Sequence, residues 1–361
     1  MVTISLCMIV KNEKETIGRC LESVRNVVDE IVIVDTGSTD RTKEIVRRYT
    51  DNIYDFEWID DFAAARNYAF SKGTQDYLFW MDADDCMLEE DREKLRELKH
   101  EIDPSVDMVT MMYVMSQDEK GNSIYSIRRE RLVKRSRNYQ WQDFVHEYIP
   151  PEGYIMDSDI AIIHNKKKSS GKRNLNMLEK RLEAGEKFTP RYLFYYANEL
   201  FEHKVFDKAA EYYHKYLDTN QMAFEDNVAA CDKLAQYYKE TGDPDKELHY
   251  LLQTMKYNSP RAEYCCRIGH HFLEKKQIDL AIRWFHMATK MEIPNHIWGL
   301  VNHLAYTWLP HLQLAIAYGM IGDVERAYYH NEIVSAYIPD DPGILDNKKK
   351  LEELMKKAQR Q

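Results

Sequence analysis

The chain has 361 residues, of which 44% are hydrophobic and 30% are charged, and its formal net charge is −10. This composition is typical of a folded soluble protein, and the length predicts two domains or one domain followed by a repeat array. The negative charge argues against a nucleic-acid partner, and no apolar run approaches the roughly 20 residues that a membrane span needs.

We expect a cytoplasmic location. The first ten residues, MVTISLCMIV, lack the basic start of a signal peptide and lead directly into a strand pattern. The chain holds no CxxC pair, and several of its cysteines lie in apolar contexts, which predicts reduced and mostly buried thiols. The six cysteines are Cys7, Cys20, Cys86, Cys231, Cys265 and Cys266.

Strands and helices alternate over residues 1–165. The run ISLCMIV (4–10) is continuously apolar, as expected for a strand that is buried on both faces. This alternation predicts a Rossmann-like α/β domain with a mainly parallel sheet and helices on both faces. The further expected strands are 30–35, 52–58, 76–82, 106–115 and 124–135, and the expected helices are 15–28, 42–49 and 62–71.

From about Asn174 onward the strand patterns end and the chain becomes helical. Short turns recur beside four aspartates that are spaced 36, 36 and 44 residues apart, namely Asp207, Asp243, Asp279 and Asp323. Periods near 34 residues with two helices each indicate tetratricopeptide-like repeats, and the clearest unit is 262–290. We therefore expect repeats over 191–361, with 166–190 forming a basic linker, a phosphate-closing loop and a helix.

The segment YLFWMDADDCM (77–87) carries the first chemical signal. A buried strand stops at Asp82, Asp84 and Asp85. One interpretation is a strand that meets solvent, with Asp85 capping a helix near Glu89. The other is a divalent-metal site, because an Asp-x-Asp pair places two carboxylates on one side of an extended chain and Mg²⁺ or Mn²⁺ prefers oxygen ligands.

Three further segments bring polar residues to the same edge of the sheet. In VDTGSTDRT (34–42), Asp35 ends a strand and is placed to accept hydrogen bonds from a base or a ribose, although an ordinary βα loop is the alternative. In MIVKNEKETI (8–17), Asn12 and Glu13 follow a strand. In FAAARNYAF (62–70), Arg66 is either a surface residue or is aimed at an anion. Together they predict a site for a base, a ribose and a metal-bound diphosphate.

In this order and spacing, SLCMIVKNE, VIVDTGSTDRT, FAAARNYA and LFWMDADD resemble the family 2 glycosyltransferases of the GT-A fold. The combination with a helical repeat tail is similar to the sublancin-type peptide S-glycosyltransferases of glycocin biosynthesis. The resemblance implies that Asp35 binds the uracil of a UDP-sugar, Arg66 lies by the base or the phosphates, Asp82 reaches the ribose, and Asp84 holds the metal. The candidate donor-binding set also includes Val10, Asn12, Glu13, Ala83, Lys172 and Arg173.

The acceptor-side base is expected in NYQWQDFVHEYI (138–149). Surface polar residues are the alternative for each of its candidates. We favour Glu147 as the base, with Asp143 as the second choice, and expect His146 to orient the base or contact substrate.

His164 follows a short apolar run, 17 residues after Glu147, where GT-A enzymes commonly supply a late metal ligand. A structural histidine is the alternative, and His146 is the second choice as ligand. The basic segments RRERLVKRSR (128–137) and KKKSSGKR (166–173) are either solvated faces or a loop that closes on the phosphates.

The main functional hypothesis is a metal-dependent, inverting transferase that moves a hexose from a UDP-sugar to Cys, Ser or Thr of a peptide. A cell-surface glycan acceptor and a non-catalytic repeat protein are the alternatives. The repeats suggest a macromolecular acceptor or a homodimer, with Trp298 and Trp308 as candidate contacts. The QxxRW motif of processive membrane synthases is missing, because Leu280 stands where its Gln would be before Arg283 and Trp284.

Overall fold

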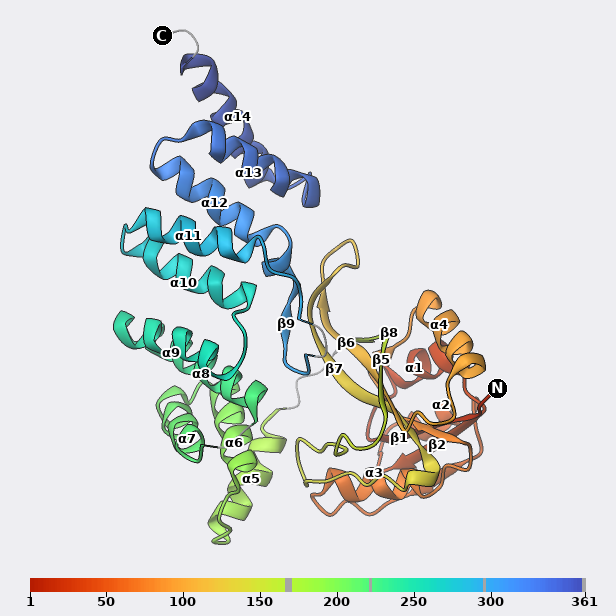
Figure 1. Ribbon diagram of the computed structural model, residues 1–361. Helices are drawn as coiled ribbons and strands as arrows, with labels where there is room; N and C mark the ends of the chain where they lie inside the picture. Colours follow the sequence, from red (N-terminus) through yellow and green to blue (C-terminus); the bar gives the residue numbers. More distant parts are fainter. Residues whose placement is uncertain (166–170, 221–222, 295–296, 359–361) are drawn as a thin grey trace. The chain divides into compact units, whose positions relative to one another are not determined.

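The computed structural model describes residues 1–165, 171–220, 223–294 and 297–358. The chain divides into two compact units, Met1–Phe188 and Thr189–Gln361, of which the first holds the sheet and the second is mainly helical (Figure 1). No helix among the described residues is long and apolar enough to cross a membrane.

The sheet of the first unit has the strand order β3-β2-β1-β4-β7-β6-β8-β5. Parallel pairing joins β1 to β2 and β4, β2 to β3, and β6 to β8, whereas β7 runs antiparallel to β4 and β6, and β5 antiparallel to β8. The expected parallel sheet is therefore present at one end and continues as a mixed sheet. The strands are β1 (Ile4–Val10), β2 (Glu30–Asp35), β3 (Ile53–Asp55), β4 (Tyr77–Phe79), β5 (Asp85–Cys86), β6 (Met108–Gln117), β7 (Ser123–Lys134) and β8 (Ile155–His164).

Helices cover both faces of this sheet, which explains why β1 is apolar at successive positions. Leu6 and Met8 of β1 share one core with side chains of α1, α2 and α4, while α3 contacts β1 and β2 without joining that core. The helices of the unit are α1 (Ile17–Val24), α2 (Thr42–Val46), α3 (Phe62–Phe70), α4 (Glu89–Glu101) and α5 (Arg173–Glu183), and a 3₁₀ helix spans Arg135–Arg137.

The strand expected at 76–82 is shorter than its apolar pattern suggested. Regular pairing ends at Phe79, and the chain then turns through Asp82 and Asp84 before Asp85–Cys86 pairs with β8. The apolar run extends past the strand because Trp80 and Met81 stay buried below the turn. The carboxylates therefore lie in a turn between two short strands and not along one extended strand.

The second unit consists of antiparallel helix pairs joined by short turns, as the aspartate spacing predicted. Asp243 and Asp323 accept hydrogen bonds from backbone N–H groups at the starts of α9 and α13, which explains their recurrence at turns. The helices are α6 (Pro190–Glu202), α7 (Phe206–Asp218), α8 (Phe224–Glu240), α9 (Pro244–Tyr257), α10 (Ala262–Glu274), α11 (Ile278–Ala288), α12 (Leu309–Met320), α13 (Val324–Tyr337) and α14 (Pro342–Ala358).

The longer spacing before Asp323 comes from an insertion between α11 and α12. It contains the two-residue strand β9 (Val301–Asn302) and a 3₁₀ helix (His303–Tyr306). Trp298 and Trp308 of this insertion are partly buried. The expected homodimer contact of these two residues stays a prediction.

Candidate active site

The turn after β4 is held by the carboxylate of Asp85. Asp85 Oδ2 accepts a hydrogen bond from the backbone N–H of Asp82 at 2.9 Å, and Asp85 pairs with His164 across β5 and β8. The side chain of Asp85 is fully buried. The interpretation of Asp85 as a helix cap is wrong, because α4 begins at Glu89 with Leu88 at the cap position and no side-chain cap bond.

Asp84 and His164 come together at this turn. Their Oδ1 and Nδ1 atoms lie 3.6 Å apart, and ligand atoms of Asp84, Asp85 and His164 all lie within 4.8 Å of one another. Among the described residues, this is the one such group of three that could hold a metal ion, and His146 is outside it. The oxygen and imidazole donors suit a divalent cation such as Mn²⁺.

The electrostatics of Asp84 also fit a cation. Burial raises the pKa of Asp84, His164 lowers it, and the neighbouring carboxylates Asp82 and Asp85 raise it again, so that the pKa lies above its usual value. The carboxylate thus lies among other negative charges, an arrangement that a bound cation would relieve. Asp85 is a poorer ligand than Asp84, because its oxygens already accept hydrogen bonds from Asp82, Tyr113 and Arg131.

Arg66 links the turn to the expected base. Its Nη2 lies 2.7 Å from Asp82 Oδ1, and its Nε lies 2.6 Å from Glu147 Oε1. The guanidinium is 4.9 Å from the ring centre of Trp80 and 4.8 Å from that of Trp141. Arg66 is only 8% exposed, so the interpretation as a surface residue is wrong.

These contacts control the charge of Asp82. Burial would raise its pKa, but the charges of Arg66 and Arg131 outweigh burial and lower the pKa to about 2. The side chain of Asp82 remains 35% exposed. Asp82 is therefore an ionised hydrogen-bond acceptor that solvent or a ligand can reach.

The segment that carries Glu147 is a tight loop docked on α3. Gln142 and Tyr148 exchange backbone hydrogen bonds of 2.9 and 3.2 Å at its base, and Phe144 O accepts one from Phe62 N at 2.9 Å. Asp143 and His146 have positive φ values of 70° and 53°. The structure brings Glu147 to Arg66, while the ion pairs of Arg66 include neither Asp143 nor His146.

The exits of β1 and β2 are joined by side-chain to backbone hydrogen bonds. Asn12 Oδ1 accepts from Thr39 N, Glu13 N donates to Thr42 Oγ1, and Val10 O accepts from Thr36 N. Most of the polar groups at this exit thus stabilise the loop itself. The expected contacts of Val10, Asn12 and Glu13 with a nucleotide-sugar donor stay predictions.

Asp35 is different, because half of its carboxylate has no partner. Its Oδ1 accepts from the backbone N–H groups of Gly37 and Ser38 at 2.9 and 2.7 Å. Its Oδ2 is buried without any hydrogen-bond partner. Burying an acceptor without a hydrogen bond costs free energy, so Asp35 Oδ2 is placed to accept a hydrogen bond from a bound ligand.

The first of the two basic segments does not behave as expected. Residues 128–134 belong to β7, where Arg128 donates to Ser158 O and Arg131 is fully buried, so this segment is neither a solvated face nor a mobile loop. Residues 166–170 lie outside the described part of the chain. Lys172 and Arg173 are exposed at the start of α5, with Arg173 4.6 Å from the ring centre of Phe62.

Sequence reasoning missed two buried polar residues behind the turn, Tyr113 of β6 and Arg131 of β7. Tyr113 Oη lies 2.6 Å from His164 Nδ1, and Arg131 Nη1 lies 3.2 Å from Asp85 Oδ2. Arg131 was hidden in a run of basic residues. Its position immediately before the apolar pair Leu132–Val133 was the available signal that it lies in a buried strand.

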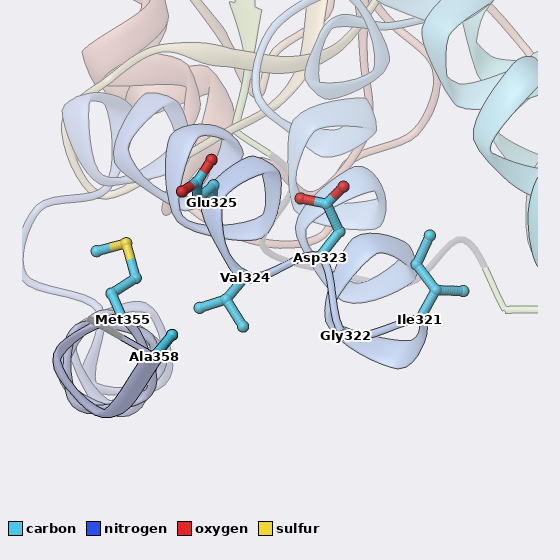
Figure 2. Close-up of a pocket in the computed structure, with 7 residues that line it drawn as sticks. All are labelled: Ile321, Gly322, Asp323, Val324, Glu325, Met355 and Ala358. Atoms are coloured by element: carbon cyan, nitrogen blue, oxygen red, sulfur yellow. The ribbon is translucent and has the colours of Figure 1, made fainter. Parts of the chain in front are cut away.

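A separate hollow lies in the second unit, between the α12–α13 turn and the end of α14 (Figure 2). One of its two acidic residues, Asp323, already accepts a hydrogen bond from Arg326 N and pairs with the Arg326 guanidinium. This hollow offers no convergent catalytic groups and is not a candidate active site. Its lining residues are Ile321, Gly322, Asp323, Val324, Glu325, Met355 and Ala358.

Comparisons with known proteins agree with this geometry. The model of the family described as glycosyl transferase family 2 matches residues 5–161. A TPR repeat-containing protein of Synechococcus elongatus is 27% identical over 88% of this chain and 74% of its own length. The SPbeta prophage-derived glycosyltransferase SunS of Bacillus subtilis is 28% identical over 64% of this chain and 57% of its own length.

A third relative, the lipopolysaccharide core biosynthesis glycosyltransferase LpsC of Rhizobium meliloti, is 31% identical over 42% of this chain and 58% of its own length. The chain thus spans little more than half the length of SunS and of LpsC. The matched family region contains the Asp82–Asp85 turn, Arg66 and Glu147. Residues 5–161 therefore form a family 2 glycosyltransferase domain of the GT-A fold, which is followed in the same chain by tetratricopeptide-like repeats.

Proposed function

We propose that the chain is a metal-dependent, inverting glycosyltransferase that transfers a hexose from a UDP-sugar to a Cys, Ser or Thr side chain of a peptide. The observation that carries the proposal is the convergence of Asp82, Asp84, His164 and Glu147 around the turn after β4. These residues come from parts of the chain far apart in sequence, and the strand pairing of β5 with β8 brings His164 to the turn.

The uridine end of the donor fits the exit of β2. Uracil carries one N–H that needs an acceptor, and Asp35 Oδ2 is a buried acceptor without a partner. The ionised Asp82 would accept from a ribose hydroxyl, as its exposure and low pKa permit.

Asp84 and His164 would hold Mg²⁺ or Mn²⁺ on the diphosphate side of the site. When bound, the metal neutralises charge on the departing UDP. Asp84 would supply one carboxylate oxygen and His164 one ring nitrogen as ligands. Arg66 keeps Asp82 and Glu147 in fixed positions through its two ion pairs.

Glu147 would act as the general base. Its carboxylate takes the proton from the acceptor S–H or O–H while the acceptor atom forms a bond to the anomeric carbon of the sugar. The bond from that carbon to the diphosphate oxygen breaks, and its electron pair leaves with UDP. Attack opposite the leaving group inverts the anomeric configuration.

The repeat unit supports a peptide acceptor. Stacked helical repeats form extended binding surfaces. The similarity to the repeat-containing protein of Synechococcus covers 88% of this chain and therefore extends beyond the family 2 domain into the repeats. A glycan acceptor is the second candidate, favoured by the 31% identity to LpsC, whose name concerns lipopolysaccharide core biosynthesis. A repeat protein without catalysis is disfavoured by the intact and ion-paired Asp82, Arg66 and Glu147.

A donor screen tests the proposal. The full chain is offered a panel of nucleotide sugars with Mn²⁺ or Mg²⁺, with and without EDTA, and both the thermal shift and the release of free nucleotide are recorded. We expect stabilisation and slow hydrolysis with UDP-sugars only, both abolished by EDTA. Stabilisation by another nucleotide sugar would refute the role of Asp35, and no response to any donor would favour the non-catalytic alternative.

Peptide and glycan acceptors are then separated by supplying each with the identified donor. Mass spectrometry of a Cys-, Ser- and Thr-containing peptide mixture detects addition of one hexose. Transfer to an oligosaccharide acceptor but to no peptide would move the acceptor assignment to the glycan class.

A further inference from the structure

Arg131, Asp85 and Tyr113 form a series of hydrogen bonds on the buried side of the candidate metal site. Arg131 Nη1 donates to Asp85 Oδ2 at 3.2 Å, and Tyr113 Oη donates to Asp85 Oδ1 at 2.8 Å. Tyr113 Oη also lies 2.6 Å from His164 Nδ1. Because His164 Nδ1 also lies 3.3 Å from Asp85 Oδ1, both the carboxylate and the phenol connect the buried arginine to the expected histidine ligand.

Arg131 occupies this position at a cost in hydrogen bonding. It is fully buried, and its Nε and Nη2 have no hydrogen-bond partner. Its guanidinium lies instead 3.7 Å from the ring centre of Trp80 and 4.3 Å from that of Tyr113. A buried cation with two unpaired nitrogens is unfavourable for folding alone, which indicates that it serves a task at the site.

We propose that Arg131, Asp85 and Tyr113 are positioning residues that fix the ring of His164 for metal binding. The inference rests on the proposed function and adds to it three residues that touch neither donor nor acceptor. Asp85 acts twice in this arrangement, because its Oδ2 also accepts from Asp82 N and so shapes the turn that carries Asp84.

Nδ1 of His164 lies at the end of these bonds, 2.6 Å from Tyr113 Oη, 3.3 Å from Asp85 Oδ1 and 3.6 Å from Asp84 Oδ1. Arg131 and the backbone N–H of Asp82 both donate to Asp85 Oδ2, and Asp85 Oδ1 accepts a hydrogen bond from the Tyr113 O–H. When Tyr113 donates its one proton to Asp85, its oxygen is an acceptor for the tautomer of His164 that carries Nδ1–H. Nε2 is then left with a free lone pair for a metal ion.

Tyr113→Phe tests this arrangement, because it removes one hydroxyl and keeps the buried ring. Tyr77→Phe is the matched control: Tyr77 is equally buried in β4, and its hydroxyl donates to Val106 O, away from the chain of bonds behind His164. Mn²⁺ is titrated into each full-length protein at constant UDP, and bound Mn²⁺ is measured from the loss of the free-ion EPR signal.

We expect Tyr113→Phe to weaken Mn²⁺ binding about 10- to 100-fold, as is typical when an outer-shell partner of a metal ligand is lost. Transfer at saturating Mn²⁺ should recover, so that the defect lies in the metal concentration for half-maximal rate and not in kcat. Arg131→Lys, which keeps the charge but loses the planar group between the two rings, should change Mn²⁺ binding in the same direction. Tyr77→Phe should bind Mn²⁺ as the unsubstituted protein does.

Equal Mn²⁺ affinity of Tyr113→Phe and the unsubstituted protein would refute the positioning role and leave the proposed function intact. Equal losses in Tyr113→Phe and Tyr77→Phe would also refute it, because they would show a general effect of removing a buried hydroxyl. If the unsubstituted protein binds no Mn²⁺ with UDP present, both the metal site and this inference are wrong.

Discussion

Two buried polar clusters, one in each unit, treat charge in opposite ways. In the first unit, the buried Arg66 is charged and forms ion pairs with Asp82 and Glu147, which stay partly accessible. In the second unit, three histidines from α11, α12 and α13 gather without a carboxylate: His311 and His330 lie 2.9 Å apart at their Nδ1 atoms, and His286 contacts Tyr318.

The pKa shifts of Arg66 and His330 follow from this difference. Burial, opposed by the charges of Asp82 and Glu147, leaves the pKa of Arg66 above its usual value, so the arginine stays charged. Burial and the neighbouring His311 and His286 lower the pKa of His330 to about 4, so that histidine stays neutral. The cluster around Arg66 keeps its groups charged, which suits a charged ligand. The histidine cluster keeps His330 neutral, which suits packing between helices.

The largest expected effect comes from removing one charge at the first site. Asp84→Asn should lower transfer about 1,000-fold or more and remove its dependence on metal, because a neutral amide is a poor ligand for a hard cation. Because the folded environment raises the pKa of Asp84, its ionised form is disfavoured by folding, and thermal stability should not fall. Steady-state transfer assays and thermal denaturation measure both quantities; full activity would refute the metal assignment.

The next largest effect should distinguish the two candidate bases, Glu147 and Asp143, by their transfer rates. Glu147→Gln should lower transfer by about 100- to 10,000-fold while donor binding is kept, because glutamine can accept a hydrogen bond from Arg66 but cannot take the acceptor proton. Asp143→Asn is the matched comparison, a neighbouring carboxylate changed in the same way. Loss of transfer in Asp143→Asn with normal transfer in Glu147→Gln would reverse the assignment.

The second unit should respond to added charge. Between about pH 6.5 and pH 4, an unfolded His330 binds a proton that the folded one does not, so stability is fully present above pH 6.5 and falls as the pH drops towards 4. The loss attributable to this group is about 3 kcal/mol. Urea midpoints measured by circular dichroism at several pH values should show it.

His330→Phe should flatten this part of the pH profile because the ring no longer titrates. The exposed His249, changed to Gln, serves as the control and should leave the profile unaltered. An unchanged slope in His330→Phe would contradict the assignment of the pH effect to this cluster.

The smallest expected effect concerns packing between α10 and α11. A Cβ added at Gly269 would lie 2.4 Å from the ring of Phe285, so Gly269→Ala should destabilise the second unit by about 1–3 kcal/mol. At Gly319 of α12 nothing lies within 4 Å, and Gly319→Ala should be neutral or slightly stabilising. Chemical denaturation of both variants makes the comparison, and equal behaviour would contradict the packing argument.

Much of the fold could be predicted from periodicity alone. The alternation of apolar strands and amphipathic helices predicted the first unit, and the recurring aspartates predicted the helix pairs, because both patterns are set by local geometry. The antiparallel addition of β7 and β5 could not be read in this way. Whether a strand joins a sheet parallel or antiparallel depends on where its partner lies, which periodicity does not reveal.

The candidate site was predictable where residues stand at strand ends, as Asp35, Asp82 and Asp84 do. Residues that act from inside the sheet were not predictable. Arg131 stood in a segment with five other basic residues, and its burial follows only from the pairing of β7 with β4 and β6. Arg66 was ambiguous for the same reason, because its two partners, Asp82 and Glu147, lie 16 and 81 residues away.

The double ion pair of Arg66 has a consequence for protein engineering. A single guanidinium pairs with both Asp82, the proposed ribose contact, and Glu147, the proposed base, so under the proposed function the two halves of the reaction are not independent modules. A library that varies residue 66 to change sugar preference would disturb the proton-accepting side in the same step. Directed changes of donor should therefore keep Arg66 and its two flanking tryptophans, and vary the loops at the exits of β1 and β2 instead.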